Sequence, residues 1–416
     1  MYKINWLFFI LVFLITNPSL SFSKGVISEA ISLDDALRVA YSANPTLREA
    51  REEISASKGR WIQAEALPNP ELEMDMGGFK DGNKQLDTIS VKQPLDPFGT
   101  RLLRGRIAHD EVNIAKNELD LIWGQVSAKI IATYYQILAF EKALDVAEEN
   151  LGTTRQFLTQ VDSRFQSGSA LKGEVLRARI EASRAENEFL TAEKDLKVSR
   201  GQMNLLLGRS ADAAISLKDT LNYEPLRLEY QGLIEKALVE RPDVQIEKTH
   251  LSSKKKGLWR SVLKTFFPQM SIGLERTTKD YDNDTALLLR ASYPLWGFNL
   301  GEVKEAKAEK KKQEIRLEAF KRQVGLDVYR TFLEAELADK QVVLQKRALD
   351  EANELLRQVT LQYEEGELLF LSYLENIKTI KETRVAYYTA LKNYQEKIAL
   401  LERAIQKTPA PEGESK

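Results

Sequence analysis

The fold is decided by a stretch that occurs twice: VSAKIIATYYQILAFEKALDVAEENLGTTRQFLTQVDSRFQSG at 126–168 and VGLDVYRTFLEAELADKQVVLQKRALDEANELLRQVTLQYEEG at 324–366. The two copies align without a gap at a separation of 198 residues, which indicates a duplicated architecture. The matched pairs are Val126 with Val324, Ile130 with Val328, Thr133 with Thr331, Leu144 with Val342, Leu151 with Leu349, Leu158 with Leu356, Val161 with Val359, Phe165 with Tyr363 and Gly168 with Gly366.

Apolar residues recur every seven positions in each copy, which predicts long helices packed as coiled coils. No proline interrupts residues 99–165, and a helix of that length extends roughly 100 Å at about 1.5 Å per residue. The chain then returns after Gly168 in the first copy and after Gly366 in the second, so two long antiparallel α-hairpins are expected. Heptads alone would favour an ordinary coiled-coil scaffold. The outgoing stripe of the first copy is Ile130, Ile137, Leu144, Leu151, Leu158 and Phe165.

Upstream of each long helix the pattern changes to strict alternation, which is typical of strands. Leu72, Met74 and Met76 alternate with acidic residues after Pro70, and a similar run follows Pro268. A polar loop, 77–85 or 276–285, leads to a second alternating run in each copy. We expect β-hairpins at 71–93 and 270–293, each of roughly membrane-spanning length, followed by matched turns at 94–99 and 294–299.

The N-terminus has the pattern of a secretory signal peptide at 1–23, with Lys3 before a short apolar run. A retained anchor is the alternative, but the run is short for a membrane span. We expect a first repeat at 24–208 with its α-hairpin at 99–208, a linker at 209–230, a second repeat at 231–406 with its α-hairpin at 299–405, and a disordered tail at 407–416. No later segment is apolar enough for a transmembrane helix, so a membrane span would be made of strands.

Composition excludes several function classes. The formal net charge is −1, so nothing favours nucleic-acid binding, and the absence of cysteine excludes disulfides and thiolate chemistry. The only histidines are His109 and His250, which match no catalytic motif and are expected at the surface. Met74 and Met76 share a strand face rather than a metal site, and the acidic loop 280–284 lacks the glycine and glutamate of a calcium loop. We expect no enzyme activity, cofactor or bound metal.

Four strands cannot close a barrel with a usable lumen, and hydrocarbon does not tolerate an open sheet edge. If the hairpins enter a membrane, several chains must combine their strands. Three chains would give a 12-stranded transmembrane β-barrel continued by a hollow bundle of helices. The expected fold is thus mainly α with a small β part, assembled as a homotrimer.

This layout resembles the TolC family of outer-membrane efflux channels, in the style of its heavy-metal and drug efflux members. The resemblance covers essentially the whole mature chain and rests on the breaks Asn44-Pro45 and Arg241-Pro242, on the two turns after the β-hairpins and on the two α-hairpin tips. It implies an exit duct in the cell outer membrane that extends into the periplasm, in contact with outer-membrane lipid, a periplasmic adaptor and an inner-membrane pump. A type I protein secretion channel and a soluble periplasmic scaffold or adaptor remain the alternatives.

The tips resemble the family motif of an aromatic residue, a glycine three residues later and a following apolar pair. In the family these tips form the periplasmic entrance and meet the adaptor. Some relatives narrow the entrance with two acidic residues, at the positions of Ser372 and Glu375; one is missing here, and Glu375 would form a ring of three carboxylates in a trimer. An ordinary solvated glutamate is the alternative. The motif residues are Phe165, Gly168, Glu174, Val175 and Leu176 in the first tip and Tyr363, Gly366, Tyr373 and Leu374 in the second.

Overall fold

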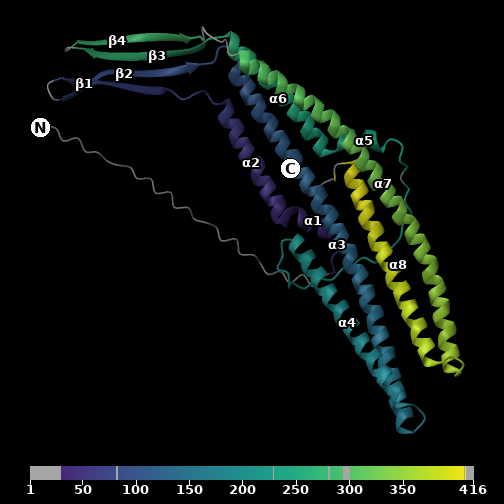
Figure 1. The fold of residues 1–416 in the computed structure, drawn as a ribbon. Coiled ribbons are helices and arrows are strands. Elements are labelled where there is room, and N and C mark those ends of the chain that lie inside the picture. The colour runs from purple at the N-terminus through teal and green to yellow at the C-terminus, as the bar shows by residue number, and fades with distance from the viewer. Residues whose placement is uncertain are drawn as a thin grey trace.

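The computed structural model describes residues 30–80, 83–227, 229–279, 282–293, 300–406 and 408. The predicted signal peptide, the turn at 294–299 and most of the predicted tail lie outside this part. The chain places a small sheet at one end of long helices (Figure 1). The elements are α1 (Leu33–Ala43), α2 (Pro45–Glu65), β1 (Glu71–Lys80), β2 (Asn83–Leu95), α3 (Thr100–Gln166), α4 (Lys172–Leu206), α5 (Leu233–Glu240), α6 (Pro242–Phe266), β3 (Gln269–Lys279), β4 (Asp282–Ser292), α7 (Leu300–Glu364) and α8 (Phe370–Ile405).

The strands form one antiparallel sheet in the order β1-β2-β3-β4. Directly opposed residues lie on the same face of such a sheet. Val91 is opposite Leu72 on one side and Leu274 on the other, whereas Ser90 is opposite Glu73 and Glu275. The sheet therefore has an apolar face and a polar face, and the predicted pair of β-hairpins is confirmed.

The predicted loops at 77–85 and 276–285 are wrong in length. β1 runs to Lys80 and β2 begins at Asn83, while β3 runs to Lys279 and β4 begins at Asp282. Thr277 pairs with Asp284 across the second hairpin. Strands are joined by backbone groups, so polar side chains near a hairpin end do not interrupt the pairing. The acidic segment 280–284 lies partly in β4, and residues 280–281 lie outside the described part.

Below the sheet, α2, α3, α6 and α7 lie side by side in that order, which repeats the order of the strands. Two buried acids connect neighbouring helices. Asp110 of α3 accepts hydrogen bonds from Lys256 of α6, at 2.6 and 2.7 Å, and from Ser253. Glu247 of α6 accepts one from the buried Gln313 of α7 at 2.7 Å and lies 3.1 Å from the guanidinium of Arg316. Because both acids are paired, their burial does not leave an isolated charge.

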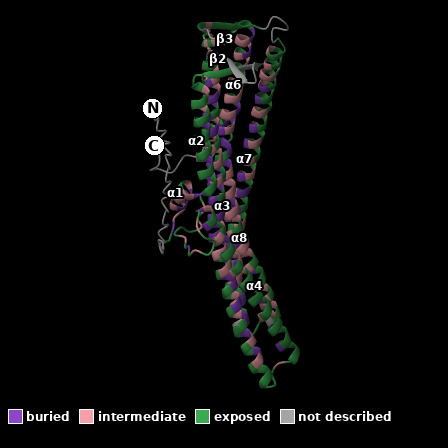
Figure 2. Ribbon diagram, turned by 90° about the vertical axis from the view of Figure 1, so that its left-hand side faces the viewer, coloured by how far each residue is buried: buried purple, intermediate pink, exposed green. Residues whose placement is uncertain are grey.

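The lower half of the molecule consists of two α-hairpins, α3 with α4 and α7 with α8, which confirms the predicted coiled-coil layout. α3 is one helix of 67 residues and α7 one of 65. The heptad residues Ile130, Ile137, Val328 and Val342 are fully buried. Buried positions follow the inner sides of the helices along the length of the molecule (Figure 2).

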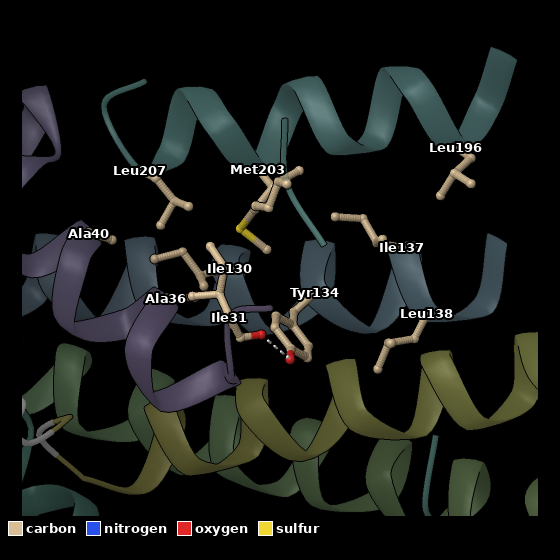
Figure 3. Close-up of a cluster of buried hydrophobic side chains, with 11 residues drawn as sticks. Ile31, Ala36, Ala40, Ile130, Tyr134, Ile137, Leu138, Leu196, Met203 and Leu207 are labelled. Carbon is tan, nitrogen blue, oxygen red and sulfur yellow. Dashed lines mark hydrogen bonds between the residues drawn. The ribbon is translucent and has the colours of Figure 1, made fainter. Parts of the chain in front are cut away.

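The linker between the repeats is fixed to the middle of the bundle by three tyrosines, Tyr134, Tyr223 and Tyr394; Tyr394 of α8 donates to the Glu224 carbonyl at 2.6 Å. Tyr134 of α3 donates toward the Ile31 carbonyl at 2.9 Å or the Asp219 carboxylate at 2.8 Å. Its ring belongs to the apolar cluster around Met203 and Ile137 (Figure 3). Burial, and then the hydrogen bond to Asp219, raise the pKa of the Tyr134 phenol. Farther along the linker, Tyr223 donates to Asp339 of α7 at 2.8 Å.

No helix in the described residues is long and apolar enough to cross a membrane. The same part of the chain contains no group of His, Cys, Asp or Glu side chains arranged to hold a metal ion. Met74 lies on the apolar face of β1, opposite Ile89. His109 is exposed and packs edge-on against Trp61, and His250 is half-buried.

Candidate functional site at the hairpin tips

The two α-hairpins reverse direction through the same backbone motif. Gly168 and Gly366 each have a φ of +79°, a left-handed conformation that favours glycine. In the first tip the Gly168 N–H donates to Phe165 and the next N–H to the Arg164 carbonyl. The second tip repeats this with Gly366 and Tyr363. Both turns are Schellman motifs, so the glycines are required by the turn itself.

The two members of the apolar pair at the first tip, Val175 and Leu176, differ in exposure. The side chain of Val175 is 5% exposed and packs with Phe157, Val161 and Ala178, whereas Leu176 and Phe165 are exposed. Val175 lies one helical turn above the N-terminus of α4 and faces α3 within the hairpin. Adjacent helix positions point in different directions, so only one residue of a Val-Leu pair can enter that core.

Two leucines outside the predicted motif have the highest exposed fractions among the large apolar side chains at the tips. Leu171 and Leu369 occupy equivalent positions as the N-caps of α4 and α8, and they are 74% and 79% exposed. An N-cap is normally a residue whose side chain accepts a hydrogen bond, and leucine cannot do this. A leucine at both caps, separated by the repeat length, was the signal available in the sequence.

Tyr363 connects the two tips. It belongs to the second repeat, yet its ring packs against the first-tip cluster around Phe157 and Val161. Its other neighbour is Tyr373, whose ring is stacked on it at 4.6 Å between centroids. Burial raises the pKa of the Tyr363 phenol. Leu374 and Tyr373 are both half-buried. The stacked rings of Tyr373 and Tyr363 form an aromatic pair between α8 and α7 in the second tip.

The predicted entrance residues lie near this contact. Glu375 and Glu174 are exposed and Ser372 is half-buried. The backbone carbonyl of Ser372 accepts a hydrogen bond from Asn376 at 2.8 Å. The structure brings Ser372 and Glu375 onto the first turns of α8, one helical turn apart, where their side chains face the same direction.

Above the tips, two ion pairs join the second hairpin to the first. Lys381 of α8 lies 2.5 Å from Glu188 of α4, and Arg384 of α8 lies 2.9 Å from Glu149 of α3. Beside them is an open groove of about 670 Å³, lined by small apolar residues such as Ala147 and Ala386 and by polar residues such as Gln345, from all four helices of the two hairpins. A contact area that combines a groove with exposed ion pairs is less tightly packed than a domain core. The contact between the hairpins therefore includes polar pairs that can be exchanged with water, in addition to the packing of Tyr363.

The duplicated α-hairpins match a known family. The family described as "Outer membrane efflux protein" matches residues 36–209 and 233–405, which are most of both repeats. The chain belongs to the outer membrane efflux protein family. Among its relatives, the cobalt-zinc-cadmium resistance protein CzcC of Cupriavidus metallidurans is 23% identical over 367 residues, which cover 87% of this chain and 86% of CzcC.

Solved structures show the same fold. The CmeC outer membrane channel of Campylobacter jejuni has a TM-score of 0.77 at 12% identity, covering 92% of this chain and 87% of CmeC. The outer membrane protein VceC of Vibrio cholerae has a TM-score of 0.72 at 15% identity, covering 90% and 96%. As a member of the outer membrane efflux protein family, the chain is an outer-membrane efflux channel that extends into the periplasm.

Proposed function

We propose that three copies of this chain form the non-enzymatic exit duct of a tripartite efflux system, with an adaptor docked at the hairpin tips and an inner-membrane pump that supplies the energy. The observation that carries the proposal is the two-faced sheet joined to helices about 100 Å long. An apolar face suits lipid, and a polar face suits a water-filled lumen. The helices continue the lumen far beyond a bilayer.

Association of several copies follows from the two lateral edges. β1 and β4 each have a partner on one side only among the described strands, so another chain must complete them inside a membrane. α7 follows β4 and forms the corresponding edge of the helical layer. It carries exposed leucines along one side, namely Leu326, Leu333 and Leu337. Four strands per chain and threefold symmetry give the twelve strands expected above.

The proposed gate is the contact between the two hairpins. Opening requires the second hairpin to move away from the first, which breaks the Lys381–Glu188 and Arg384–Glu149 pairs and withdraws Tyr363 from its cluster. Adaptor contacts with the exposed Leu171 and Leu369 would favour the open arrangement by binding it more tightly. Glu375 would then line the entrance.

For the cargo, we propose ions or small toxic compounds rather than a polypeptide. The similarity to CzcC, a cobalt-zinc-cadmium resistance protein, supports metal cations. An entrance ring containing Glu375 would attract cations and repel anions.

The experiment is outer-membrane fractionation of the mature protein, its mass in detergent, and conductance in planar bilayers. A trimer with discrete conductance supports the proposal. A monomeric, non-conducting species would exclude the duct.

A further inference from the structure

The four helix ends next to the sheet are strongly basic. The eight residues of each helix closest to the sheet, 58–65 of α2, 100–107 of α3, 259–266 of α6 and 300–307 of α7, contain nine Lys or Arg and three Glu. The whole chain has a net charge of −1, so this excess is local. We call these four segments the basic collar. A concentration of one sign at one level of an elongated molecule points to a partner of the opposite sign there.

Part of the collar has a structural role and part is available for binding. Arg101 and Arg104 donate to the carbonyls of Glu65 and Ala64 at 3.0 and 2.8 Å, which satisfies the C-terminus of α2. Lys58, Arg106, Lys304 and Lys307 are exposed, and one or two come from each of three helices. The binding capacity of the collar thus rests on these four residues.

Exposed aromatic side chains accompany the charges. Trp259 and Phe266 are 64% and 61% exposed and lie two turns apart on one side of α6. Within the chain α6 is flanked by α3 and α7, so this side is not covered by a neighbouring helix. Tryptophan concentrates where a membrane meets water, because its ring is apolar and its N–H can reach a polar partner.

The position of the collar specifies the partner. Its eight-residue segments extend about 12 Å below the sheet, so they cross the headgroup layer of one leaflet, about 5–8 Å, and reach the adjoining water. We propose that the collar binds anionic phospholipid headgroups in the periplasmic leaflet of the outer membrane, with Trp259 at the level of the headgroups. This rests on the proposed insertion of the sheet. Phosphate groups and arginine or lysine attract each other, and several cations near an anionic surface add their contributions.

The test uses the full-length protein in vesicles of phosphatidylcholine, with a minor fraction of either brominated phosphatidylglycerol or brominated phosphatidylcholine. Bromine quenches nearby tryptophan, and subtraction of the Trp259→Phe protein isolates the signal of Trp259. We expect stronger quenching by brominated phosphatidylglycerol, reduced by high salt. In the variant Lys58→Gln/Arg106→Gln/Lys304→Gln/Lys307→Gln the preference should fall by about tenfold or more.

A matched control removes four exposed cations far from the sheet: Lys172→Gln/Arg177→Gln/Arg322→Gln/Arg347→Gln. It should keep the preference. Any of three results would overturn the inference. The wild-type protein could be quenched equally by both lipids, or the control variant could lose as much of the preference as the collar variant. The collar could also bind soluble cell-wall fragments without any lipid preference. If the collar variant fails to fold, the wild-type protein alone tests the proposal: a preference for brominated phosphatidylglycerol that high salt does not reduce would overturn it. Conductance of the same vesicles separates the two proposals: a conducting channel without lipid preference refutes only this one.

Discussion

Gly168 and Gly366 hold the same left-handed conformation at the two hairpin tips, and neither has a heavy atom within 4 Å of the position of an added Cβ. The constraint at these sites is therefore backbone strain rather than lack of space. A β-branched residue in this conformation costs on the order of 1–2 kcal/mol, and this cost falls on the tip alone.

Gly366→Val should impair efflux while trimers still form. Valine disfavours the left-handed turn, so the second tip would shift and present Leu369 differently. Efflux can be measured by growth in the presence of the exported compound, and assembly by mass in detergent. Gly366→Asn is the control, because asparagine tolerates this conformation and should retain most activity. Unchanged efflux in Gly366→Val would argue against a role of the tip.

Replacement of Leu171 and Leu369 by aspartate should abolish efflux without loss of folding. Both side chains are already in water, and aspartate at an N-cap adds a hydrogen-bond acceptor, so stability should rise by about 0.5–2 kcal/mol per helix, while an apolar docking contact would be lost. Co-purification with the adaptor measures docking. Leu190→Asp, an exposed leucine farther up α4, is the control and should bind the adaptor normally. Normal docking of the double variant would show that the adaptor binds elsewhere.

Lys381→Glu should raise the resting conductance. The change replaces attraction to Glu188 by repulsion, at a pair that is partly solvent-exposed and worth no more than about 1 kcal/mol in stability. Single-channel recordings would show more frequent opening. The reciprocal variant Glu188→Lys/Lys381→Glu restores opposite charges and should return the conductance toward that of the wild-type protein. Failure of this rescue would mean that the pair does not control the gate.

Stability should decline in strongly alkaline solution through the tyrosines that hold the linker. Burial, and then the hydrogen bond to Asp339, raise the pKa of Tyr223 to about 12, and burial raises that of Tyr394 to about 12. The unfolded chain has a tyrosine pKa of about 10, so the stabilisation is complete below pH 10 and is lost as the pH rises from about 10 through about 12.

Denaturant unfolding at a series of pH values tests this. Tyr223→Phe should lower stability by about 1 kcal/mol at neutral pH, because the Asp339 carboxylate loses a donor, and should show a smaller alkaline decline. Tyr329→Phe, at an exposed position on α7, serves as the comparison. Parallel pH profiles for the wild-type and Tyr223→Phe proteins would contradict the assignment.

Asp110→Ala should destabilise the upper bundle by roughly 3–5 kcal/mol, since Lys256 would keep its charge without its carboxylate partner. Thermal unfolding followed by circular dichroism measures the loss. Glu309→Gln, which weakens the more exposed pair with Lys254, should change stability by less than about 1 kcal/mol. Similar effects of the two variants would mean that burial does not set the cost.

Much of the fold follows from periodicity, which is a local property. Ile130 and Val328 lie in heptads and are buried, and Val91 lies in an alternating run and faces the apolar side of the sheet. The lengths of the β-hairpin loops could not be predicted, because strands pair through backbone groups, and the polarity of the side chains does not show where this pairing ends. The burial of Val175 could not be predicted, because two adjacent apolar residues do not show which of them faces the partner helix.

The contacts between repeats were not predictable in the same way. Lys381 and Glu188 lie far apart in the sequence, and each resembles the many solvated charges around it. The contact of Tyr363 with the cluster around Phe157 likewise depends on the relative orientation of the two hairpins. Leu171 and Leu369 could have been found, because their positions repeat and their residue type is unsuitable for a helix cap.

The attachment of the linker at Tyr134 and Asp339 also divides the molecule mechanically. From Asp339 to the end of α7 there are 25 residues, or about 38 Å of helix. A tilt of only about 6° at that level would displace the far end by about 4 Å. It would displace the level of Asn353, which contacts Arg384, by about 2 Å, enough to lengthen ion pairs of 2.5 and 2.9 Å beyond the limit of about 4 Å. The second hairpin is thus a lever arm, and a rotation too small to disturb the sheet or the upper helices is sufficient to release its contacts with the first.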